Sequence, residues 1–108
     1  MAVRGKTPRR VTMAGQHYKV KTWQDVLRVT LTQIRELGDD VFDQVSNEFS
    51  KYIGRSGLSL RIPKQLGDSA FFYEGNLSAE AIHKLCSQAV QQVGLAAHEW
   101  HVDMAETE

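Results

Sequence analysis

The sequence has little of what identifies a secreted or membrane protein. Cys86 is the single cysteine among 108 residues, so no disulfide can form within the chain. Apolar stretches extend over only a few residues, whereas a membrane-spanning helix needs about 20. No charged, apolar and small-residue leader opens the chain. These absences predict a cytoplasmic protein with no membrane span.

Charge of either sign is not in excess. Thirteen basic and thirteen acidic residues give a formal net charge of zero, which removes the simplest argument for a polyanionic partner. The charges are nevertheless segregated along the chain. Residues 1–21 hold six basic residues and residues 49–67 hold four, with no acid in either segment. Such segregation predicts separate positive and negative surfaces.

Sequence motifs that mark enzymes are also missing. No serine stands in a G-x-S-x-G setting, and no glycine-rich phosphate loop precedes a helix. Cys86 falls on the apolar stripe of an expected helix, where a thiol behaves as a small hydrophobic group. The chemistry of His98, Glu99, His101 and Asp103 suits a metal. On a strand the two histidines point to opposite faces, so only Glu99, His101 and Asp103 converge. His17 would join them only if the first and last strands pair. We predict no enzymatic activity, no metal site and no cofactor.

The patterns that are present indicate short strands and three helices. Apolar residues alternate on either side of residues 14–16 and predict a β-hairpin around a glycine turn. Helical spacing extends over residues 22–38, 39–52 and 78–94. Thr22 and Asp25 have the spacing of a capping box, and Ser78 is a suitable N-cap for the third helix. Further strands are expected over residues 58–61, stopped by Pro63, and over residues 70–74 and 98–104.

This order of elements predicts an α+β domain. We expect a small antiparallel or mixed sheet, in the order β-β-α-α-(β)-β-α-β, with the helices packed on one side. Residues 1–8 lack apolar periodicity and are interpreted as a flexible basic arm. Residues 9–104 form the single domain, and residues 105–108 form an acidic tail.

Cations, hydroxyls and glycines combine in the two acid-free segments as they do on phosphate-contacting surfaces. A nucleic acid, DNA or RNA, is therefore the first hypothesis for a partner, although basic loops are also ordinary solvated surface. The residues expected to make these contacts are Arg9, Arg10, Lys19, Lys21, Arg55, Arg61 and Lys64.

Two longer stretches carry a partial resemblance to a family. They are residues 15–23, GQHYKVKTW, followed by Val26 and Leu27, and residues 73–82, YEGNLSAEAI. In these stretches the chain resembles a small uncharacterised α+β module associated with bacterial restriction, defence and mobile-element proteins that handle DNA. The resemblance implies a fold and a setting near nucleic acids, and it carries over no catalytic residue.

The competing hypothesis is a protein-interaction or oligomerisation module. It would use the acidic second helix and the acidic tail against a basic partner or a second copy of the chain. A third hypothesis, an inhibitor or regulator of a bacterial defence system, relies on the same surfaces. The sequence does not separate these alternatives.

Overall fold

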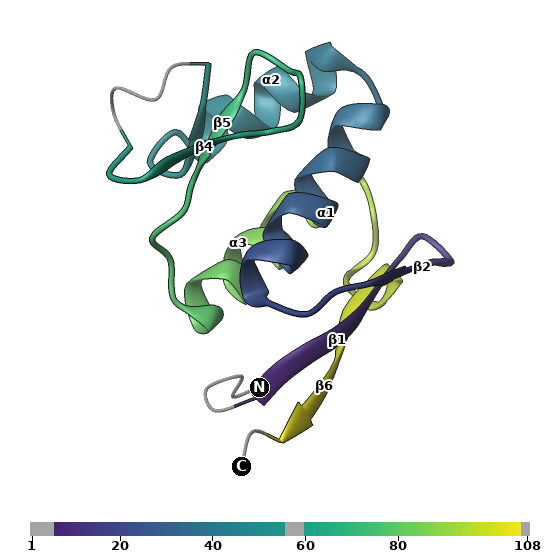
Figure 1. The fold of residues 1–108 in the computed structure, drawn as a ribbon. Helices are drawn as coiled ribbons and strands as arrows, with labels where there is room; N and C mark the ends of the chain where they lie inside the picture. Colours follow the sequence, from purple (N-terminus) through teal and green to yellow (C-terminus); the bar gives the residue numbers. More distant parts are fainter. Residues whose placement is uncertain (1–5, 56–59, 107–108) are drawn as a thin grey trace.

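A three-stranded antiparallel sheet joins the two ends of the chain. The structure, a computed structural model, describes residues 6–55 and 60–106. In it, β1 (Lys6–Met13) lies between β2 (Gln16–Lys19) and β6 (Trp100–Glu106) (Figure 1). Ala14 and Gly15 join β1 to β2 with φ angles of 51° and 81°, the positive values of a type I′ hairpin turn. The predicted hairpin is confirmed.

The ends of this sheet correct the boundaries expected from sequence. Residues 6–8, interpreted as part of a flexible arm, belong to β1 and pair with residues 104–106 of β6. Ala105 and Glu106 therefore belong to a strand as well, not to a separate tail. The local pattern missed this pairing because the two strands lie at opposite ends of the chain. Residues 1–5 and 107–108, the rest of the arm and the tail, are outside the described residues.

The closing strand starts two residues later than predicted. His98 and Glu99 belong to a short 3₁₀ turn, η2 (Ala97–Glu99), in which the Glu99 N–H donates to the Ala96 oxygen at 2.9 Å. Strand pairing with β1 begins at Trp100, opposite Met13.

Helix α1 (Trp23–Glu36) begins at the predicted capping box. The Asp25 N–H donates to Thr22 Oγ1 at 3.1 Å, and the Thr22 N–H donates to Asp25 Oδ2 at 3.3 Å. Residues at helical spacing fill the core, with the exception of Leu37, which follows the last turn and is 56% exposed. Gly38, with φ of 134°, then leads into α2 (Asp39–Glu48).

Helix α3 (Ala79–Gln92) has the predicted N-cap, because Ser78 Oγ accepts the Ala81 N–H at 3.1 Å. It packs beside α1, and both helices cover one face of the first sheet (Figure 1). The core between them consists of buried apolar side chains from both helices and the sheet: Val11, Val26, Leu27, Leu31, Ile34, Ile82, Leu85, Cys86, Ala89, Val90, Trp100 and Val102. The predicted α+β class is confirmed.

A second small antiparallel sheet packs against α2. It has the order β3-β5-β4, formed by β3 (Ile53–Gly54), β5 (Phe72–Glu74) and β4 (Pro63–Gln65). The strand predicted over residues 58–61 is corrected: β4 begins at Pro63, and residues 60–62 are not extended strand. Arg61 and Ile62 donate their N–H groups to the Glu74 carboxylate at 2.9 and 2.8 Å instead. Leu58 and Ser59 lie outside the described residues.

Candidate functional site: a basic groove beside β1

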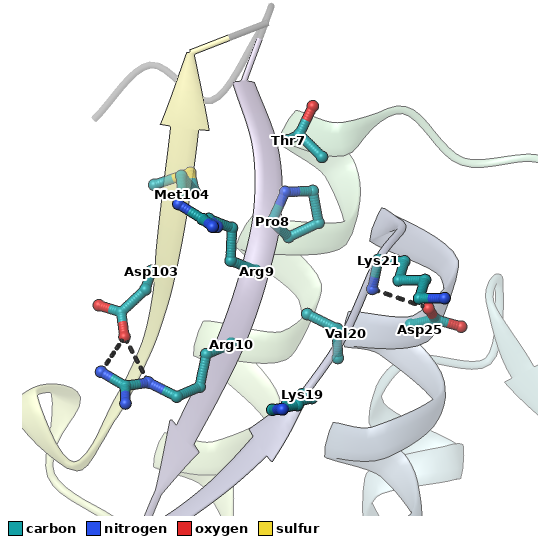
Figure 2. Close-up of a pocket in the computed structure, with 10 residues that line it drawn as sticks. All are labelled: Thr7, Pro8, Arg9, Arg10, Lys19, Val20, Lys21, Asp25, Asp103 and Met104. Atoms are coloured by element: carbon teal, nitrogen blue, oxygen red, sulfur yellow. Dashed lines mark hydrogen bonds and ion pairs between the residues drawn. The ribbon is translucent and has the colours of Figure 1, made fainter.

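An open groove of about 850 Å³ runs between the first half of β1 and the start of α1 (Figure 2). It exists because β2 pairs only with residues 10–13 of β1. Past that point the Val20 N–H donates to the Arg9 oxygen at 3.1 Å, and the chain then turns away into α1. The lining comes from β1, β2, α1 and β6: Thr7, Pro8, Arg9, Arg10, Lys19, Val20, Lys21, Asp25, Asp103 and Met104.

Four of the seven predicted contact residues line this groove. Arg9, Arg10, Lys19 and Lys21 are all exposed there. Arg10 is held by Asp103, with Nε and Nη2 at 2.7 and 2.6 Å from Oδ2. Within residues 6–55 and 60–106, no ion pair engages the other three cations. Arg9, Lys19 and Lys21 can therefore bind an external anion without breaking an internal contact.

Both acids of the groove are used in structural contacts. Asp25 accepts the Lys21 N–H at 3.0 Å and forms the capping box of α1. These backbone hydrogen bonds, led by that of Lys21, lower the pKa of Asp25 and keep it ionised. Asp103 is occupied by Arg10. With four cations and two carboxylates, the lining carries two more positive charges than negative charges.

Apolar side chains lie among these charges. Val20 and Pro8 are buried, and Met104 is half-buried. Figure 2 shows Pro8 and Val20 between β1 and the start of α1, with Lys19 and Lys21 to either side of Val20. Low-dielectric walls next to like charges strengthen the local potential. The groove is thus suited to a ligand that has negative charge and some apolar surface.

The other three predicted contact residues are elsewhere. Arg55 makes a two-pronged ion pair with Asp43, with Nη2 at 2.8 and 2.9 Å from the two carboxylate oxygens, and lies 4.6 Å from the centre of the Phe71 ring. Arg61 is exposed just before β4, and Lys64 is exposed within β4 of the second sheet. The aliphatic stem of Lys64 lies over Gly75, where a Cβ would be 2.7 Å from its Cε.

The two basic segments therefore do not form one surface. The first sheet and the second sheet lie at opposite ends of the molecule (Figure 1), and none of the described residues of the second segment, 49–55 and 60–67, lines the groove. Because Arg55 already satisfies its guanidinium with a carboxylate, it acts first as a structural residue.

The first and last strands do pair, which was the condition for adding His17 to the histidines near the C-terminal end. Thr12 lies opposite His101 on one side and opposite His17 on the other. Thr12 Oγ1 is 2.9 Å from His17 Nδ1, and His101 Nε2 is 3.6 Å from Asp103 Oδ1. Across the described part of the chain, no group of three histidine, cysteine or carboxylate side chains is arranged to hold a metal ion.

Cys86 has the inert environment expected from its position. Its side chain is fully buried in the core, and burial raises the pKa of the thiol to about 12. At neutral pH the thiolate needed for nucleophilic attack is absent.

The acidic second helix, α2, on which the protein-interaction hypothesis relies, is partly neutralised by arginines of the same chain. In α2, Asp39 lies 3.6 Å from Arg35, and Asp43 is held by Arg55. Only part of this acidity is available to a basic partner.

No protein-family model matches the chain, and neither the curated proteins nor the solved structures include a match to it. Over the residues described, no helix is both long and apolar enough to cross a membrane.

Proposed function

We propose that the protein is a non-enzymatic accessory module whose groove binds the phosphate backbone of a nucleic acid. The observation that carries the proposal is that Arg9, Lys19 and Lys21 all line one groove, with no acidic partner among the described residues. Arg10 adds a fourth cation fixed in position by Asp103. Basic side chains of this kind make the phosphate contacts that dominate nucleic-acid affinity.

The groove favours recognition of the backbone over recognition of sequence. Its polar groups are mainly flexible cations, which contact phosphate oxygens and carry no information about the bases. Met104 is half-buried and offers apolar surface for sugars or base edges, and the buried Pro8 and Val20 complete the apolar part of the lining. The resemblance to modules found with DNA-handling proteins favours the same class of partner. DNA and RNA are both accommodated by this chemistry.

A salt-dependent titration tests the proposal. We expect fluorescence anisotropy with labelled single- and double-stranded DNA and RNA to show binding whose affinity falls linearly with salt on a log-log plot. Three or four phosphate contacts give a slope between about −2 and −4. In the variant R9Q/K19Q, loss of two contacts should lower the magnitude of the slope by about 1.4 to 1.8.

The matched control removes the same charge at the other end of the molecule. R61Q/K64Q also neutralises one arginine and one lysine, both exposed and both outside the groove. This variant should keep the wild-type slope. Binding that R61Q/K64Q weakens as much as R9Q/K19Q would exclude the groove as the site, and no binding at low salt would exclude the function.

A further inference from the structure

Strand β6 presents an outer edge that is available for pairing. It is a terminal strand of the sheet β2-β1-β6, so within the described residues only β1 bonds to it. Exposed edges of natural sheets are often protected by lysine, proline, a bulge or short length. β6 has seven residues, WHVDMAE, with neither lysine nor proline. The other edge strand, β2, has four residues and carries Lys19.

The irregularity in this sheet does not interrupt β6. Pro8 pairs with Met104 and Arg10 pairs with Asp103, so the extra residue, Arg9, belongs to β1. β6 therefore keeps the regular alternation of a strand along its outer edge.

The ladder determines which backbone groups face outward. In an antiparallel pair, alternate residues exchange hydrogen bonds with one neighbour. The Ala14 N–H donates to the Glu99 oxygen at 2.8 Å. Glu99 therefore directs its carbonyl toward β1. Because the direction alternates along a strand, Trp100 and Val102 direct their N–H and C=O groups away from β1. An added strand would bond to these groups.

We propose that the occupant of this edge is a second copy of the chain, with β6 pairing antiparallel to β6 about a two-fold axis at Val102. In this register the two copies of Val102 exchange hydrogen bonds, and His101 lies opposite Asp103 of the partner subunit. The contact occurs twice by symmetry. Residues 101 and 103 then form non-hydrogen-bonded pairs, in which side chains approach most closely.

The charges on β6 favour this register over the two registers in which the two-fold axis is shifted by one residue. Moving the axis by one residue in either direction places His101 opposite its own copy, or Asp103 opposite its own copy. Like charges directly opposite each other destabilise a sheet, whereas opposite charges stabilise it. The zero net charge of the chain also leaves little long-range repulsion between copies.

The local contacts leave Asp103 able to accept the new bond. Arg10 binds Oδ2, while Oδ1 is 3.6 Å from His101 Nε2 of the same chain, too far for a hydrogen bond. His101 faces the neutral Thr12 on β1. The other charged or titratable groups near it are Arg10 on β1, Glu99 in the η2 turn before β6, and His17 across Thr12 on β2. Asp103 also lines the groove, where it holds Arg10, so the two proposed sites share this residue, whereas His101 lies outside the groove.

Sedimentation equilibrium over a wide concentration range tests this interface. We expect a monomer–dimer equilibrium in which the dimer fraction rises with protein concentration. H101D places carboxylates opposite each other and should weaken the dimer roughly two- to thirtyfold, from two cross-strand pairs. H101K places a positive charge opposite Asp103 of the partner subunit and should preserve the dimer.

The matched control is H17D, the same substitution on the opposite edge of the same sheet. It should leave the dimer unchanged, and circular dichroism of all variants should show the wild-type fold. A wild-type protein that is monomeric at every concentration would overturn the proposal. So would a dimer that H101D leaves intact, or one that H17D weakens as much as H101D does. Nucleic-acid binding by the groove variants is measured separately by fluorescence anisotropy. The dimer and the nucleic-acid function can therefore be rejected independently.

Discussion

At the scale of single residues, Glu74 organises the approach to β4. Its side chain is buried, and its carboxylate accepts the N–H groups of Ile62 and Arg61. These two hydrogen bonds lower the pKa of Glu74, the Ile62 bond contributing most. One side chain thus provides the partners that a strand would otherwise supply to residues 61 and 62.

The variant E74Q should lower the free energy of unfolding at neutral pH, because an amide oxygen replaces a charged acceptor of two N–H groups. The folded pKa lies below the unfolded value of about 4.3. The stabilisation by the carboxylate is therefore complete above that value and lost as pH falls through the lower folded pKa. Urea unfolding followed by tryptophan fluorescence should show a difference between E74Q and wild type that shrinks as the pH is lowered below the unfolded pKa of glutamate.

The control for this experiment is E48Q, at an exposed position near the end of α2. It should change the free energy of unfolding by no more than about 0.5 kcal/mol. An E74Q protein as stable as wild type at neutral pH would contradict the stabilising role assigned to the Glu74 carboxylate.

At the scale of elements, one buried hydrogen bond joins α1 to β6. Trp100 Nε1 donates to Thr30 Oγ1 at 3.1 Å, and both residues are buried. The two lie far apart in the sequence, yet each satisfies a polar group of the other within the apolar core. This bond fixes how the helix sits on the sheet.

The variant T30V keeps the shape of the side chain but leaves the Trp100 indole N–H unpaired. It should cost about 1–3 kcal/mol of stability. T32V is the matched control, because Thr32 is half-buried on the same helix and donates only to the Arg28 oxygen of its own helix at 2.7 Å. Urea unfolding of both variants measures the difference. Equal stability of T30V and T32V would contradict the assigned role of this bond.

Local signals predicted the starts of α1 and α3 and the hairpin, whereas α2 ends at Glu48 and not at residue 52 as expected. The capping box of α1, the N-cap of α3 and the turn at residues 14 and 15 rest on contacts between residues at most four apart. Such interactions form wherever those residues occur together. The strand expected over residues 58–61 failed in its described part because Glu74, more than ten residues later, takes up the N–H groups of residues 61 and 62.

At the scale of the whole molecule, Cys86 reports on opening of the core. Its thiol is fully buried, with its pKa raised to about 12. A thiol-specific reagent should therefore label the native protein only as fast as the core opens, and at once in denaturing urea. Q88C, at an exposed position of α3, should give one equivalent of fast labelling in the native state. Rapid labelling of wild type without urea would contradict the assigned packing of α3.

The sequence by itself determined the three helices, the caps of α1 and α3, the hairpin and the burial of Cys86, since periodicity and short-range hydrogen bonds encode them. Only the tertiary structure decided how the charges are distributed. The pairing of β1 with β6 brings Asp103 and Met104 to the groove, and the approach of α2 to β3 gives Arg55 its partner Asp43. Seven cations alike in sequence thus separate into four in a groove, one in a structural ion pair and two at the far end. Their roles depend on contacts between residues distant along the chain, and no local pattern encodes those contacts.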